Sequence, residues 1–236
     1  YRQLANVFFK QKEYAKSIEI ANLYLKIYHE SKDIDKNEVN LILADNYFSS
    51  GEFAKSIEIY NRLPKNDYTL YQKCLSYFNM NNYDNSIKLA SEFTASFPNS
   101  RYIYDAKFIA AYSYYKLNQM PASIKILNDI YEKISNESNK IIALQILIEF
   151  YMSVKDHQNA IKWLTIQSEN PKLSTPAADY NLSEVYYSAG DYSNAVKHIM
   201  KIINSSDFES VKQKNYRKLV DCYIKLKNYN IALSTI

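Results

Sequence analysis

The stretch YNLSEVYYSAGDYSNA, residues 180–195, decides the fold of this chain. An apolar pattern with helical spacing runs through Leu182 and Tyr186 and resumes at Tyr192. Between the two parts, Gly190 and the aspartate after it form the corner that a tight turn requires. The stretch therefore predicts two short amphipathic helices folded back on each other as a hairpin.

The same pattern recurs along the whole chain. A small residue opens the second helix of each hairpin, and successive cases lie 30 to 39 residues apart: Ser17, Ser56, Ser86, Ser123, Ala160, Ala195 and Ala232. Nine positions before each small residue stands an aromatic residue: Phe8, Tyr47, Tyr77, Tyr114, Tyr151, Tyr186 and Tyr223. Three positions before it stands a ring or a substitute for one: Tyr14, Phe53, Tyr83, Met120, His157, Tyr192 and Tyr229. This agreement predicts an array of about seven repeated hairpins.

The repeat resembles the tetratricopeptide repeat family, whose unit of roughly 34 residues is a helix, a tight turn and an antiparallel helix. The motif Leu182-x3-Tyr186-x5-Tyr192-x2-Ala195 matches that family's pattern place for place. The resemblance implies an all-α, right-handed α-solenoid of about seven helix-turn-helix units, the first and last incomplete. We expect residues 1–236 to be a single solenoid domain and a fragment of a longer protein, because the chain starts inside one helix and stops inside another.

Composition agrees with an all-helical chain that has a sizeable core. Of the 236 residues, 47% are hydrophobic, and only 2 are glycine. So few glycines predict few turns that need a positive φ, and the pattern lacks the punctuation of strands and hairpins. The four serines among the seven small residues depart from the family, which prefers alanine there.

Charge, apolar segments and cysteine content argue against nucleic-acid binding, a membrane span and a disulfide bond. The net charge of +4 is spread evenly along the chain, which argues against a nucleic-acid footprint of clustered basic residues. No segment reaches the ~18 apolar residues of a membrane span. Cys74 and Cys222 fall four units apart, so we expect two buried, small hydrophobic residues and no disulfide between them.

Residue patterns typical of catalysis do not occur. The three histidines, His29, His157 and His198, fall in different units without the spacing of metal ligands. Two glycines cannot build a glycine-rich phosphate loop. The sequence therefore predicts a protein that is not an enzyme and that carries no cofactor or metal.

The resemblance implies a concave groove lined by the first helix of each unit. The face that points into it includes the residue after each conserved aromatic and residues one or two turns earlier. Our candidates for a partner-binding groove are Phe9, Phe48, Tyr71, Phe78, Phe108, Tyr112, Tyr115, Met152, Tyr180 and Tyr187. The alternative is that these residues only pack. The central units, where the aromatic residues gather, are the best candidate for an anchor.

One known binding mode can be tested against the sequence. Chaperone-binding family members hold a C-terminal carboxylate with basic and asparagine side chains from three units, and Arg2 and Asn6 fit the first unit. The later places lack the required residues and hold Ile42, Tyr68 and Gln72. Acidic residues are expected in the same groove instead: Asp45, Glu149, Glu184 and Asp221. Such a groove suits a partner with apolar and some basic side chains.

The segment FPNSRYIYDAKFIAA, residues 97–111, resembles bacterial envelope repeat proteins such as outer-membrane assembly lipoproteins and Tol-associated periplasmic proteins. A capped helix start explains the segment equally well. We expect a non-enzymatic scaffold that binds a protein or peptide segment, and a periplasmic role in cell-envelope assembly is the leading hypothesis. The alternative is a targeting or regulatory module of a larger enzyme or signalling protein, in the cytoplasm. Self-association through the groove or the ends is a third hypothesis.

Overall fold

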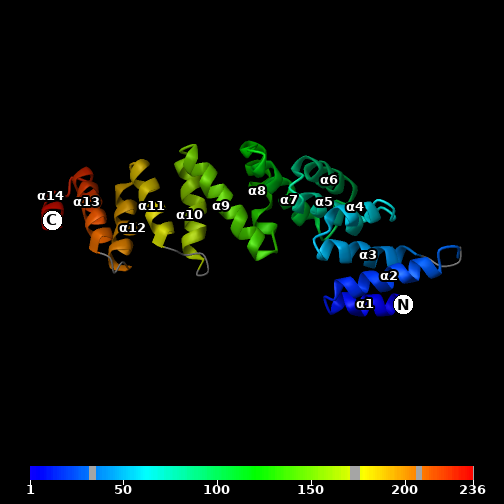
Figure 1. The fold of residues 1–236 in the computed structure, drawn as a ribbon. Helices are drawn as coiled ribbons and strands as arrows, with labels where there is room; N and C mark the ends of the chain where they lie inside the picture. The colour runs from blue at the N-terminus through cyan, green and yellow to red at the C-terminus, as the bar shows by residue number, and fades with distance from the viewer. Residues whose placement is uncertain (32–35, 171–175, 206–208, 236) are drawn as a thin grey trace. The chain divides into compact units, whose positions relative to one another are not determined.

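The computed structural model describes residues 1–31, 36–170, 176–205 and 209–235. These residues form fourteen α-helices and one 3₁₀ turn, and no β-strand occurs among them. In chain order (Figure 1), the elements are α1 (Arg2–Lys10), α2 (Tyr14–Ile27), α3 (Asn37–Ser49), α4 (Phe53–Tyr60), α5 (Asp67–Asn79), α6 (Tyr83–Ser96), α7 (Ile103–Lys116), α8 (Met120–Ile130), η1 (Tyr131–Lys133), α9 (Glu137–Ser153), α10 (His157–Glu169), α11 (Pro176–Ser188), α12 (Tyr192–Ser205), α13 (Glu209–Lys225) and α14 (Tyr229–Ser234). The predicted all-α class is therefore confirmed.

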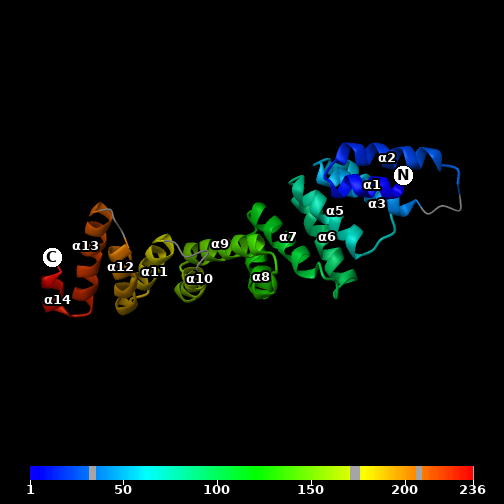
Figure 2. The same cartoon turned by 90° about the horizontal axis from the view of Figure 1, so that it is seen from below.

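The helices pair into seven hairpins that belong to two compact units (Figure 2). Unit 1, Tyr1–Asn136, holds the hairpins from α1 to α8, and unit 2, Glu137–Ile236, holds those from α9 to α14. Within each unit the second helix of one hairpin packs against the first helix of the next, as α6 does against α7 and α12 against α13. This stacking is the predicted solenoid arrangement. That both units form a single domain stays a prediction.

The small residue of every hairpin is buried. Its exposed fraction is 0% in Ser17, Ser56, Ser86, Ser123 and Ala195, 1% in Ala160 and 4% in Ala232. A larger side chain at this place would hold the helix backbones apart. The register predicted from the sequence is therefore confirmed in all seven hairpins.

Serine stands at four of these places, and its hydroxyl has partners at three of them, whereas Ser123 Oγ has none in the described part of the chain. Ser17 Oγ donates to the carbonyl oxygen of Ala5 at 2.7 Å and accepts from Nδ2 of Asn46 at 2.8 Å. The hydroxyl oxygens of Ser56 and Ser76 lie 3.1 Å apart. Asn46 and Ser76 both belong to the next hairpin, so these bonds join neighbouring hairpins. A buried hydroxyl is tolerated when it is bonded in this way.

All seven hairpin turns contain a residue with positive φ, and the expectation of few such turns was wrong. The residue stands five positions before the small residue, with φ between 57° and 83°, at Lys12, Gly51, Asn81, Asn118, Lys155, Gly190 and Lys227. The turn tolerates side chains because its backbone bonds satisfy the last carbonyls of the first helix. In the fifth hairpin, the amide of Lys155 donates to Met152 O at 3.2 Å, and the next amide donates to Tyr151 O at 3.0 Å.

Both cysteines are buried, as predicted. The exposed fraction of Cys74 and of Cys222 is 0%, and Cys74 Sγ donates to the carbonyl oxygen of Ser86 at 3.4 Å. Burial raises the pKa of the Cys74 thiol to about 12 and that of the Cys222 thiol to about 11. Because the reactive form of cysteine is the thiolate, neither side chain is a nucleophile at neutral pH.

Replacing Lys155 by glycine should stabilise the protein. A left-handed conformation costs a residue with a side chain about 1–2 kcal/mol, whereas glycine adopts it freely at a smaller entropic cost. We expect Lys155→Gly to raise the free energy of unfolding by about 0.5–1 kcal/mol, measured by urea denaturation. The control Lys162→Gly lies inside α10 and should lower it by about 1 kcal/mol. A loss of stability in Lys155→Gly would contradict the turn geometry.

Enlarging a small residue should destabilise unit 2. Ala195 lies in a cluster with Ile199, Leu219 and Cys222, so a longer side chain has no space to enter. We expect Ala195→Leu to cost about 1–3 kcal/mol of unfolding free energy in thermal or urea denaturation. The exposed residue Ala177 provides the matched control, because Ala177→Leu should change the value by less than about 0.5 kcal/mol. Equal effects of the two variants would show that the register is wrong.

Candidate functional site

Four of the ten predicted groove residues pack against an aromatic ring of their own hairpin. The partner in each case is the ring three positions before the small residue. The ring centroids are 6.0 Å apart in Phe9–Tyr14, 5.4 Å in Phe48–Phe53, 6.0 Å in Phe78–Tyr83 and 5.4 Å in Tyr187–Tyr192. These pairs bridge the two helices of a hairpin beside its turn. The row predicted from the sequence therefore has a packing role, and a binding role for the row stays a prediction.

Helices α5 and α7 bring the central predicted residues together. The ring of Tyr112 on α7 lies 5.5 Å from that of Phe78 on α5 and 5.9 Å from that of Tyr115. It also stacks on Phe108, with 6.0 Å between centroids and 9° between planes. Phe108 is only 4% exposed, so its ring is not available to a partner. It contributes to the surface by packing against the Tyr112 ring.

A second group of rings contains residues that the sequence did not single out for the groove. Tyr71 of α5 stacks on Tyr102, the N-cap of α7, with centroids 4.6 Å apart and planes at 8°. Tyr68 lies 6.2 Å from Tyr102, and the guanidinium carbon of Arg101 lies 4.6 Å from the centroid of the Tyr102 ring. Tyr102 stands immediately before α7, outside the repeated positions, so the repeat pattern did not mark it.

These residues form one candidate surface, which we call the tyrosine surface: Tyr68, Tyr71, Phe78, Tyr102, Tyr112 and Tyr115. All six belong to unit 1, and each is partly exposed. Aromatic side chains of this kind combine a large apolar area with a polar edge, so they suit contact with a partner. The structure thus gathers Tyr71, Phe78, Tyr112 and Tyr115 of the predicted set and adds Tyr68 and Tyr102.

Asp105 places a carboxylate in the first turn of α7, where its charge acts on Tyr71. Burial raises the pKa of the Asp105 carboxyl above its ordinary value, and no hydrogen bond or ion pair to it occurs among the described residues. The pKa of the Tyr71 phenol is also raised, first by burial and then by the nearby charge of Asp105. Asp105 is therefore a partly desolvated carboxylate without a cation beside it.

Asp45 on α3 is a second partly buried carboxylate in unit 1, but it has partners. The hydroxyl of Tyr60 donates to Asp45 Oδ1, and a bond from the hydroxyl of Tyr68 also acts on the carboxyl. Burial raises the pKa of Asp45 more than these two bonds lower it. Gln72 Nε2 donates to the Tyr68 hydroxyl at 2.9 Å. Tyrosine hydroxyls therefore compensate Asp45, and the amide of Gln72 bonds to one of them.

Arg2 and Asn6, which fit the first unit of the carboxylate-binding mode, lie beside α3 of the next hairpin. Arg2 forms an ion pair with Glu38, and a shallow pocket between α1 and α3 is lined by Arg2, Gln3, Asn6, Glu38, Leu41 and Ile42. The guanidinium is thus already neutralised by a carboxylate of the next hairpin, and the pocket is a poor site for an acidic terminus.

The predicted residues of unit 2 lie beside lysines of α13. Lys214 Nζ is 5.4 Å from the centroid of Tyr180, and Lys218 Nζ is 5.1 Å from that of Tyr187. Lys218 also pairs with Glu184 at 2.6 Å. Met152 lines a shallow pocket that includes Glu184. The aromatic rings of unit 2 therefore already carry cations from the same chain.

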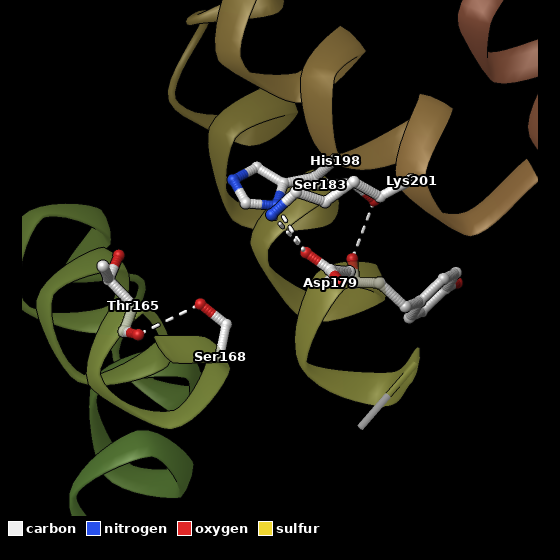
Figure 3. Close-up of polar contacts among 7 residues, drawn as sticks. Thr165, Ser168, Asp179, Ser183, His198 and Lys201 are labelled. Carbon is white, nitrogen blue, oxygen red and sulfur yellow. Dashed lines mark hydrogen bonds and ion pairs between the residues drawn. The ribbon is translucent and has the colours of Figure 1, made fainter. Parts of the chain in front are cut away.

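A polar cluster joins α11 to α12 (Figure 3). Asp179 Oδ1 lies 2.7 Å from His198 Nδ1 and 3.6 Å from Lys201 Nζ. The ring of Tyr186 stacks on His198 at 5.6 Å. Ser183 Oγ donates to the carbonyl oxygen of Tyr180 at 2.7 Å. Since that serine hydroxyl bonds to backbone and not to the histidine, the three side chains do not form a hydrolase triad.

Neither a metal site nor a membrane-spanning helix occurs in the part of the chain that the structure describes. Within it, no group of three histidine, cysteine or acidic side chains is placed to hold a metal ion. Within the same residues, none of the helices has the length and apolar character needed to cross a bilayer.

Comparison with known sequences matches residues 68–100 to the sequence model of the tetratricopeptide repeat. The match covers α5, α6 and their connection, which is the third predicted unit. It supports the tetratricopeptide repeat assignment and gives no support to the envelope subgroup. Among curated proteins, no sequence matches this chain.

Solved structures share the fold. A tetratricopeptide repeat protein from Parabacteroides merdae ATCC 43184 has a TM-score of 0.58 at 11% identity, covering 99% of this chain and 94% of its own. The apo form of RapI has a TM-score of 0.53 at 14% identity, covering 99% and 73%. A structure of Naa15/Naa10 bound to HypK-THB has a TM-score of 0.51 at 13% identity, covering 92% and 32%. The fold of this chain is therefore that of tetratricopeptide repeat solenoids.

Removing the charge of Asp105 should stabilise the isolated protein at neutral pH. A carboxyl whose pKa is higher in the folded than in the unfolded state binds more protons when folded, so stability falls as pH rises through that range. We expect Asp105→Asn to unfold at a higher urea concentration than the wild type at pH 7. The advantage should shrink as pH falls below the ordinary value of 3.8. An equal advantage at both pH values would contradict this account of Asp105.

Proposed function

We propose that this chain is a non-enzymatic scaffold that binds a segment of another protein on the tyrosine surface of unit 1. The observation that carries the proposal is the gathering of five partly exposed rings on α5 and α7 and a sixth, Tyr102, at the N-cap of α7, next to a buried core. Exposed apolar surface that is gathered in one place is a common feature of protein–protein interaction sites.

The chemistry of the surface supports a protein partner. Tyrosine side chains lose little conformational entropy on binding and contribute both apolar area and hydrogen bonds, so they are common among the residues that dominate interface energy. The rings also hold one another in place, as Phe108 supports Tyr112 and Tyr102 supports Tyr71. A preorganised surface loses less conformational entropy when the partner binds.

The fold agrees with this function. Stacked hairpins expose a long face of first helices, and such extended faces suit an elongated or helical segment. The similarity to a structure of Naa15/Naa10 bound to HypK-THB concerns the fold alone. The partner assigned here therefore rests on the tyrosine surface itself.

Two finer hypotheses remain from the sequence. A role in bacterial cell-envelope assembly rests on the resemblance of residues 97–111, which the structure also explains by local packing, since Ser100 Oγ donates to Asp67 Oδ2 at 2.8 Å. The alternative is a targeting module of a larger enzyme or signalling protein. A secretion signal or a catalytic domain in the complete gene would distinguish them.

The proposal predicts that Tyr112 carries binding energy. We would select binders from a phage-displayed library of random 12-residue peptides on the full chain, synthesise the most enriched peptide and measure its affinity by fluorescence anisotropy. Tyr112→Ala should weaken binding by about tenfold or more, because truncating an aromatic anchor costs about 1–2 kcal/mol or more.

The control for this experiment is Tyr104→Ala. Tyr104 lies on the same helix, but its ring lies under Lys133 Nζ at 5.7 Å and is not part of the tyrosine surface. Circular dichroism should show both variants folded. Selection of no peptide, or equal affinity for the wild type and Tyr112→Ala, would refute the proposed function.

A further inference from the structure

We propose that a groove on unit 1, separate from the tyrosine surface, binds an amphipathic helix of a partner protein that carries an acidic side chain beside its apolar face. Residues of α6, α7 and α8 line this groove, and α7 packs against both of the other helices. Its volume is about 530 Å³, which lies within the range of protein ligand sites. The inference does not depend on the proposed function, because it concerns other residues of unit 1.

The groove and the tyrosine surface use different faces of α7. Ala110 lines the groove, whereas the ring of Tyr112 belongs to the tyrosine surface. Each residue turns a helix by about 100°, so these two side chains leave the axis of α7 about 200° apart. One segment on each face can therefore be bound at the same time.

Alanine stands in this groove where most hairpins have leucine. Thirteen positions before the small residue, the seven hairpins hold Leu4, Leu43, Lys73, Ala110, Leu147, Leu182 and Leu219. Leu43, Leu147 and Leu182 are at most 5% exposed, so their side chains fill space inside their hairpins. Ala110 leaves the equivalent space open. Helices approach each other more closely where the side chains at the contact are small.

The floor of the groove is apolar. Ala90 and Ala110 belong to one buried core cluster, and Ile126 of α8 packs against that cluster while it stays partly exposed. An amphipathic helix places apolar side chains three and four positions apart into a groove of this kind. The apolar floor therefore suits the apolar face of a partner helix.

The charged side chains of the groove favour an acidic partner. Three of them line it, Lys107, Lys125 and Asp129, so two positive charges accompany one negative charge. Lys107 Nζ lies 3.5 Å from Asp129 Oδ2. Lys125 is exposed and forms no ion pair within the described part of the chain. A carboxylate beside the apolar face of the partner would pair with Lys125 and so fix how the helix lies in the groove.

The experiment first selects peptides on the Tyr112→Ala variant, in which the tyrosine surface is weakened. The phage-displayed library holds helix-forming peptides of about 16 residues, because shorter helices are marginal in water. We expect the enriched peptides to carry apolar residues at helical spacing with aspartate or glutamate beside them. The most enriched peptide is then synthesised with a fluorescent label, and its affinity for the wild type and for the variants below is measured by anisotropy.

Two variants test the groove itself. Ala110→Leu introduces the residue that five other hairpins have there, and it should weaken the peptide by about tenfold or more by filling the groove. Lys125→Glu reverses an exposed charge and should weaken it by about fivefold. The matched control is Lys197→Glu, the equivalent exposed lysine of α12, which should change the affinity by less than about twofold. Circular dichroism and urea denaturation verify the fold of each variant.

The outcomes separate this inference from the proposed function. If no peptide is enriched on Tyr112→Ala, or if Lys125→Glu and a folded Ala110→Leu bind like the wild type, the groove site is wrong and the tyrosine surface stands. Enriched peptides that are basic or uncharged would overturn the acidic partner. A wild type that sediments as a dimer, with Ala110→Leu as a monomer, would instead assign the groove to a second copy of the chain. Displacement of the labelled peptide by one selected for the tyrosine surface would contradict two separate sites.

Discussion

The close contact between the two helices of each hairpin, at one small buried residue, is the constraint on which the structure depends. All seven small residues are at most 4% exposed, and a left-handed residue five positions earlier sets up each contact by reversing the chain. In four of the seven hairpins, the aromatic residue before the turn also lies against the ring that follows it. The hairpin is thus specified locally, and the solenoid results from repeating it.

Much of the fold could be predicted from the sequence because these constraints act over short distances. The spacing of the small residues and rings located all seven hairpins. The turn conformation was missed for a physical reason: glycine was treated as the signal of positive φ, whereas Lys155 and Asn81 adopt it because their turns satisfy helix-end carbonyls. A strong set of backbone hydrogen bonds outweighs the local cost of a side chain in that region.

The candidate site was predictable only in part. Periodicity placed Tyr71 and Tyr112 on the face of the first helices, but exposure depends on what packs above and below a ring. Phe108 became the support of Tyr112, and Tyr102, which precedes α7, became the partner of Tyr71. A register argument gives the direction of a side chain and not its neighbours across two helices, so Asp105 and Tyr102 could only be recognised in the structure.

The repeat also explains how one backbone presents different charges. Glu184 stands eleven positions before its small residue, and its partner Lys218 stands fourteen before the small residue of the next hairpin. Asp45 occupies the equivalent of Glu184, but Gln72 occupies the equivalent of Lys218, so phenols compensate Asp45 where a cation compensates Glu184. These two hairpins therefore differ in whether a cation of the same chain neutralises the carboxylate. Because the place lies outside the small residues and turns, both side chains occur on the same hairpin backbone.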